Sequence, residues 1–116
     1  MYNKQLEREL KIIVQSLKSH ETISVLDILE KKENVFMDKT FQSMQPHHLE
    51  SGINCTCCTL THNKINSTGF GRTRQEALVN SAKSYLENLI TTNTLVPQLR
   101  TALKQKGIRT TPTPLP

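Results

Sequence analysis

The chain has no tryptophan, and aromatic residues make up only 4% of its 116 residues. Hydrophobic residues account for 35%, so the core must be small, although it suffices for a domain of roughly 70 residues. No stretch approaches the roughly 20 apolar residues that cross a bilayer, and the N-terminus lacks the apolar segment of a signal peptide. These absences predict a soluble, cytoplasmic protein with no membrane partner.

Cysteine is scarce, and its three copies crowd into four positions as Cys55, Cys57 and Cys58. An odd, clustered set argues against a disulfide framework. On a strand, Cys55 and Cys57 share one face while Cys58 lies on the other, so they cannot close a tetrahedral zinc site alone, even with His62 nearby. We expect them to be small buried apolar residues and predict no metal or other cofactor. No Ser-His-Asp triad, Cys-His pair or pair of carboxylates stands out, so we expect that the protein is not an enzyme.

Acidic residues are absent from the C-terminal part of the chain after Glu87. The basic residues that follow are Arg100, Lys104, Lys106 and Arg109. The net charge is +5, which favours an acidic partner. A basic end of this kind is usually solvated, and contact with nucleic acid is the alternative interpretation. In residues 110–116 prolines alternate with other residues, and we expect this segment to be extended or disordered.

Two helices are predicted in the N-terminal part. Residues 3–19 carry one apolar stripe on an otherwise charged rod. The stripe consists of Leu6, Leu10, Ile13 and Leu17. It is too short for a secure coiled coil, so docking onto the domain and dimerisation are both open. The second helix is predicted over Ile23–Lys32, with Thr22 or Ser24 as its cap.

Shorter segments with strand character follow, and then a long helical segment. The predicted elements are strands over Lys39–Met44, Ile53–Thr61 and Ile65–Thr68, a helix over Arg74–Ile90 and a final helix over Leu99–Gln105. This order predicts an α+β domain of α-β-β-β-α type, with an antiparallel three-stranded sheet and two helices on one face. It divides the chain into an N-terminal helix over residues 1–20, a domain over 22–91 and a basic C-terminal segment over 92–116.

The segment that opens the long helix has the strongest chemical character in the chain. Gly69–Gly71 precedes Thr73, a good N-cap, and Glu76 lies three residues later as in a capping box. Backbone N–H groups at the helix start, the positive end of the helix dipole, Arg72 and Arg74 then meet at one point. Such a point attracts phosphate.

With this motif in place, the α-β-β-β-α order resembles the double-stranded RNA-binding domain family over about residues 22–91. The family usually has Gly-x-Gly, then Ser or Thr, then Lys-Lys-x-Ala-Lys, where this chain has Gly69-Phe70-Gly71-Arg72-Thr73-Arg74-Gln75-Glu76-Ala77-Leu78. Between its first two strands the family often carries Gly-Pro-x-His. Here Gln45-Pro46-His47-His48 keeps the proline and has His48 at the matching position.

The resemblance implies binding of double-stranded RNA by shape, with the first helix of the domain and the His48 loop in minor grooves and the Thr73 helix start on phosphates. The RNA-binding residues that it implies are Asp27, Glu30, Lys31, Pro46, His47, His48, Arg72, Thr73, Arg74 and Gln75. Such a protein shields duplex RNA from processing or sensing, as a suppressor of RNA silencing does, or delivers RNA to a larger complex.

The chain departs from the family at the phosphate-binding helix start. Of the three family lysines, only Arg74 keeps a positive charge, because Gln75 and Leu78 replace the others. Each lost phosphate contact removes counterion release, which lowers the affinity and its salt dependence. Degenerate members of the family keep the fold and bind proteins instead. The alternative function is therefore a protein-protein interaction or dimerisation module, with the N-terminal stripe pairing two subunits.

Overall fold

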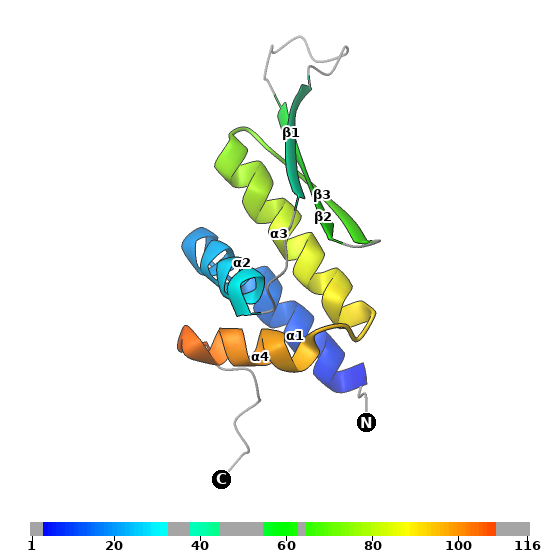
Figure 1. The fold of residues 1–116 in the computed structure, drawn as a ribbon, viewed down its shortest axis with the longest axis vertical. Helices are drawn as coiled ribbons and strands as arrows, with labels where there is room; N and C mark the ends of the chain where they lie inside the picture. Colours follow the sequence, from blue (N-terminus) through cyan, green and yellow to red (C-terminus); the bar gives the residue numbers. More distant parts are fainter. Residues whose placement is uncertain (1–3, 33–37, 45–54, 63–64, 109–116) are drawn as a thin grey trace.

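The computed structural model of the protein describes residues 4–32, 38–44, 55–62 and 65–108. Its elements are α1 (Lys4–Ser16), α2 (Ser19–Lys32), β1 (Asp38–Met44), β2 (Cys55–His62), β3 (Ile65–Gly71), α3 (Arg74–Thr91) and α4 (Val96–Gln105). The strands form an antiparallel sheet in the order β1-β2-β3 (Figure 1). The predicted α+β class and the antiparallel meander are confirmed. Within these residues no helix is long and apolar enough to cross a membrane.

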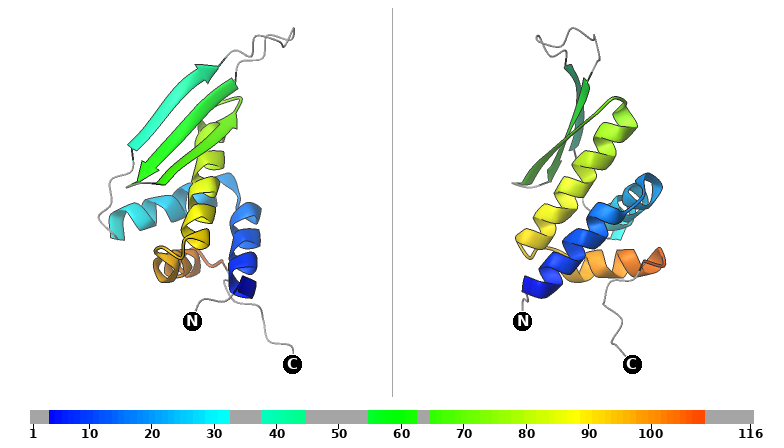
Figure 2. Two further views of the ribbon diagram at one scale, coloured as in Figure 1. Left: turned by 90° about the vertical axis from the view of Figure 1, so that its right-hand side faces the viewer. Right: turned by 180° about the vertical axis from the view of Figure 1, so that it is seen from behind.

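The sheet has one covered face and one open face. Phe41 pairs with Cys58, and Cys58 pairs with Gly69, so this row points toward the core, where α3 lies across β2 and β3 (Figure 2). Among the described helices none covers the opposite face. Its described residues, which follow from the alternation along each strand, are Asp38, Thr40, Gln42, Cys55, Cys57, Thr59, Thr61, Asn66, Thr68 and Phe70.

The second helix begins earlier than the sequence predicts. It starts at Ser19 rather than Ile23, so Thr22 is not a cap but lies inside α2, where its hydroxyl donates to the Lys18 carbonyl over 3.0 Å. The predicted alternative cap, Ser24, also lies within the helix. At the actual start, the Glu21 carboxylate accepts a hydrogen bond from the Lys18 N–H over 2.8 Å, as the acidic residue of a capping box does with the N–H of the cap residue.

The third strand runs through both glycines, whereas the prediction ended it at Thr68. A Cβ atom at Gly69 would collide with the backbone nitrogen of Ser81 and would lie 2.6 Å from the carbonyl carbon of Asn80. At Gly71 it would lie 2.7 Å from the backbone nitrogen of Ala77. The glycines therefore act as contact points that let β3 lie directly against α3, not as a flexible turn.

Side chains of α3 complete this contact by bonding to the backbone of β3. The Ser81 hydroxyl donates to the Ser67 carbonyl over 2.9 Å, and the Asn80 amide donates to the Phe70 carbonyl over 2.6 Å. The Asn88 amide donates to the Ser67 hydroxyl over 2.9 Å. Because β3 is an edge strand, these bonds satisfy polar groups that would otherwise have to find water or another chain.

The N-terminal helix lies against the same core as the sheet and α3. Leu10, Val14 and Leu17 are buried, and Leu6 and Ile13 pack against the core as half-buried residues. The apolar stripe is thus covered by this chain itself. The side chains that α4 adds to the same core are Val96, Leu99, Ala102 and Leu103. This last helix begins at Val96, before the predicted Leu99, because proline is tolerated in a first turn.

A buried polar pair lies within this core. The Nδ1 atom of His62 is 2.7 Å from the Tyr85 hydroxyl, and both side chains are nearly inaccessible to solvent. Burial, together with the negative charge of Glu30, raises the pKa of Tyr85 to about 12. The tyrosine therefore stays protonated in the folded protein at any physiological pH.

Replacing Gly69 by alanine should strongly destabilise the fold, because the added methyl group meets backbone atoms of α3 that cannot move separately. We expect a loss of about 3 kcal/mol in the free energy of unfolding, at the upper end of overpacking costs. Chemical denaturation measures it. Thr68→Ala, on the open face one residue away, is the control and should cost well under half as much; equal losses would contradict the close approach at Gly69.

Stability should fall between pH 10 and about 12 through Tyr85. In this window the unfolded chain releases the phenolic proton while the folded chain keeps it. The contribution of Tyr85 to the free energy of unfolding is therefore fully present below pH 10 and is lost as the pH rises toward 12. Two pKa units correspond to about 2–3 kcal/mol. Denaturation across this window should show a shallower decline for Tyr85→Phe than for the parent. Parallel declines would show that Tyr85 ionises equally in both states.

Candidate nucleic-acid interface

The start of α3 is fixed by hydrogen bonds of its own first turn. Thr73 is the N-cap, with extended backbone at φ −124° and ψ 163°, and its hydroxyl accepts the Glu76 N–H over 3.1 Å. The predicted cap is confirmed. The Glu76 carboxylate accepts the N–H of Arg72 over 3.3 Å, one residue before the cap, rather than the N–H of the cap itself. This bond closes the segment between β3 and α3 into a defined geometry.

Two backbone N–H groups at this helix start remain available to a ligand. Within the described part of the chain, the amides of Arg74 and Gln75 have no acceptor, whereas the Glu76 amide bonds Thr73 and the Ala77 amide bonds the Thr73 carbonyl over 3.0 Å. Open amides at the positive end of a helix dipole favour an anion.

Arg74 is held in place by an aromatic ring from another element. Its guanidinium carbon lies 5.3 Å from the centroid of Phe41, a half-buried residue of β1. This is within the range of a cation-π contact. Phe41 was not predicted to belong to the site, because its contact with Arg74 depends on the pairing of β1 with β2 and on the position of α3.

The local charge is smaller than two arginines suggest. Arg72, Arg74 and Gln75 are exposed, but the Glu76 carboxylate lies at the same helix start, so the net charge there is +1. Leu78, which occupies the position of the third family lysine, is half-buried and packs against the core. Its apolar side chain therefore has a structural role.

Polar residues line a hollow beside this helix start. Its lining includes Gln75 and Asn80 of α3 and Ser19 at the beginning of α2. Lys83 also lines it, but its ammonium donates to the carbonyl of Gln15 over 2.9 Å and so helps to attach α1 to α3. The hollow thus extends the polar surface from the start of α3 to the start of α2.

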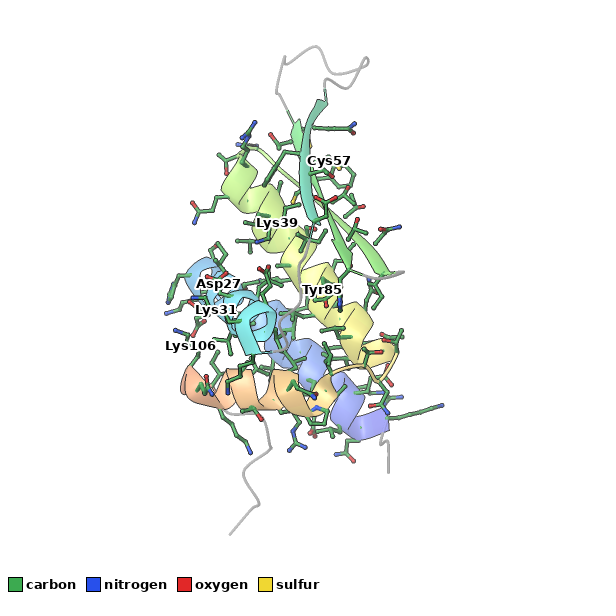
Figure 3. The ribbon with its side chains drawn as sticks, in the orientation of Figure 1. Asp27, Lys31, Lys39, Cys57, Tyr85 and Lys106 are labelled. Atoms are coloured by element: carbon green, nitrogen blue, oxygen red, sulfur yellow. The ribbon has the colours of Figure 1, made fainter. Side chains whose placement is uncertain are left out.

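The candidate residues of α2 divide into two groups. Asp27 and Lys31, one turn apart, are exposed and point outward (Figure 3). The carboxylate of Glu30 instead lies 3.1 Å from the ammonium of Lys39, which joins α2 to β1, and its charge reaches Tyr85. Asp27 and Lys31 therefore lie on the outer surface, whereas Glu30 pairs with the sheet through Lys39.

Pro46, His47 and His48 lie outside the described residues. The strands on either side of them are informative. Met44, the last residue of β1, pairs with Cys55, and Thr56 of β2 pairs with Gly71. Both strands therefore reach the end of the sheet from which α3 starts, as Figure 1 shows.

The cysteine cluster forms no second site. Cys57 and Cys58 are buried and Cys55 is half-buried. Burial raises the pKa of the Cys58 thiol, which opposes formation of the thiolate that a metal or an electrophile requires. In the parts of the chain that the structure describes, no three His, Cys, Asp or Glu side chains are placed to hold a metal ion.

The described residues thus bring together Arg72, Thr73, Arg74 and Gln75 at one helix start, with Asp27 and Lys31 on a neighbouring helix. In Figures 1 and 3 the start of α3 and these two residues of α2 lie on the same side of the molecule. Searches against protein-family models and curated proteins find no match to this chain.

Proposed function

We propose that the protein binds double-stranded RNA by its shape. The observation that supports this most directly is the start of α3, where two open amides lie beside two exposed arginines, Arg72 and Arg74. In the proposed complex this helix start binds phosphates, and the exposed side chains of α2 enter a minor groove. The fold needs no catalytic group for this role.

The chemistry of duplex RNA suits such a surface. Its major groove is deep and narrow, so proteins read the phosphates and the 2′-hydroxyl groups of the shallow minor groove instead of base sequence. Amide donors and guanidiniums serve the phosphates. Asp27 offers a carboxylate that accepts from a ribose hydroxyl, and Lys31 offers a donor one turn away.

The contact between Arg74 and Phe41 favours binding by preorganisation. A guanidinium already resting on a ring loses less side-chain freedom when a phosphate arrives, and its outer N–H groups remain available. This compensates in part for the uncharged Gln75. The affinity should nevertheless be modest and only moderately dependent on salt, because few phosphates are neutralised at this helix. Shielding of RNA and its delivery to a complex are both compatible with such binding.

Arg72→Gln/Arg74→Gln should weaken binding to a duplex RNA of about 20 base pairs by roughly tenfold or more, and should make the plot of log affinity against log salt shallower by about two. Titration over a salt series measures both quantities. The control is Lys4→Gln/Arg8→Gln, which removes the same charge from exposed positions of α1. Titration with a duplex DNA of the same sequence tests whether the protein recognises the shape of duplex RNA.

The outcomes separate cleanly. Strong preference for RNA, lost in the α3 variant and kept in the α1 control, supports the proposal. Equal binding to RNA and DNA, or the same loss in both variants, would reduce the interaction to nonspecific attraction by a basic protein. Absence of binding by the parent at low salt would overturn the proposal.

A second candidate function is self-association through the open face of the sheet. The observation that favours it is Phe70, whose side chain is 52% exposed on that face beside Cys57. An exposed aromatic side chain on an uncovered sheet is typical of a contact surface. The N-terminal stripe is less suited to this role because the chain buries it against its own core.

If this face pairs two subunits, Phe70→Ser should shift a dimer toward the monomer without loss of fold. Sedimentation of parent and variant over a concentration series measures the shift. Ile12→Ser, at the other large exposed apolar side chain of the described chain, is the matched control. A parent that is monomeric at every concentration, or a dimer that only Ile12→Ser dissociates, would contradict pairing through Phe70.

A further inference from the structure

The last helix presents a basic surface that the proposed RNA site does not use. Its buried residues attach it to α2 and α3, so its opposite face is turned to solvent. On that face and just beyond it Thr101, Lys104, Gln105 and Lys106 are exposed. The helix is therefore a fixed part of the domain, and its lysines are carried on a rigid support.

The charge of this surface is not balanced nearby. Within the described residues, Lys104 and Lys106 form no ion pair, and neither do Lys31 and Lys32 at the end of α2. The described residues of the chain after Glu87 contain no acidic side chain. Asp27 is the exposed carboxylate on the neighbouring turn of α2. The surplus of positive charge lies on α4 and its C-cap, which carry Arg100, Lys104 and Lys106 without an acidic residue, and it favours a polyanion as partner.

The placement of this surface relates it to the start of α3. In Figure 3, Asp27, Lys31 and Lys106 lie on one side of the molecule, and α2 and α4 are in contact. In Figure 1 the start of α3 lies on that side above α2, and the end of α4 lies on it below. Thus α2 lies between two groups of basic side chains.

We infer that α4 is an accessory phosphate-binding element for duplex RNA. Lys104 and Lys106 would contact RNA phosphates next to the minor groove that α2 enters. The inference rests on the proposed function and extends its surface. A rod-like duplex laid along this side meets the start of α3, then α2, then the end of α4. Lysine suits such a role because it serves phosphate as a mobile point charge without demanding exact geometry.

The same lysines also have a purely structural interpretation. Cations in the last turn of a helix interact favourably with its dipole. Lys104 lies in that turn, and Lys106 is the C-cap. If this were their only role, their removal would change the stability of the protein and leave RNA binding unaltered once the protein is folded.

The test uses the full chain, a duplex RNA of about 24 base pairs and a shorter one of about 16, the length that such a domain spans. Lys104→Gln/Lys106→Gln should weaken binding to the long duplex by roughly fivefold or more and reduce the salt slope by about one to two. The shorter duplex should show a smaller loss, because less backbone reaches α4. Lys4→Gln/Arg8→Gln is the charge-matched control, because the start of α1, which carries these residues, lies on the opposite side of Figure 1 from the end of α4.

Thermal unfolding ensures that each variant is folded at the temperature of the titration. Loss of affinity and slope in the α4 variant, but not in the α1 control, supports the inference. Binding that depends on Arg72 and Arg74 but is unchanged by the α4 substitutions would overturn it while leaving the proposed function intact. A parent protein that binds no duplex RNA would overturn both.

Discussion

The architecture depends on the direct contact of β3 with α3 at Gly69. Because any side chain there would occupy the space of the Ser81 backbone, the distance between strand and helix is set by the backbones themselves. Ser81 and Asn80 then bond to strand carbonyls on either side of the glycine, which fixes the contact along the strand as well. The remaining helices pack around α3: α1 and α4 bury their apolar residues in the core that it shares with β2. The sheet and the other helices therefore all pack against α3, which fixes their positions relative to one another.

The same contact determines the geometry of the candidate site. Gly71 follows Gly69 on β3, and Thr73 caps α3 two residues later, so the chain has little freedom between the strand and the helix start. The hydrogen bond from the Arg72 N–H to the Glu76 carboxylate restricts the backbone of this segment further. Phe41 approaches from β1, two strands away, and restrains Arg74. A phosphate would therefore meet donors whose positions are already established by the fold. Such preorganisation matters most where charges are few, since less of the binding energy is spent on ordering.

The local signal at Thr73 predicted the start of α3, whereas the local signals for the starts of α2 and α4 did not, and the roles of Gly69, Glu30 and Phe41 depend on nonlocal contacts. The cap at Thr73 and the helix over Arg74–Ile90 followed from short-range spacing, and the structure ends that helix at Thr91. The antiparallel meander followed from the order of the elements. The role of Gly69 could not be predicted, because a glycine before a helix indicates a turn unless the opposing backbone is known. Glu30 carried no sign of its contact with Lys39, which requires β1 to return beside α2. Phe41 was missed for the same reason.

The packing at the helix start suits the uncharged residues at positions 75 and 78. At position 78 the side chain contacts the core, so leucine stabilises the domain where a lysine would have to extend past apolar surface to reach solvent. At position 75 the side chain lines a polar hollow toward α2, where glutamine can bond without adding a charge close to Arg72 and Arg74. Among the exposed cationic side chains are Arg72 and Arg74 at the helix start and Lys104 and Lys106 at the end of α4. If the protein binds a polyanion, the cations for it therefore lie at the first turn of the helix that organises the core and at the end of α4, and not along the body of that helix.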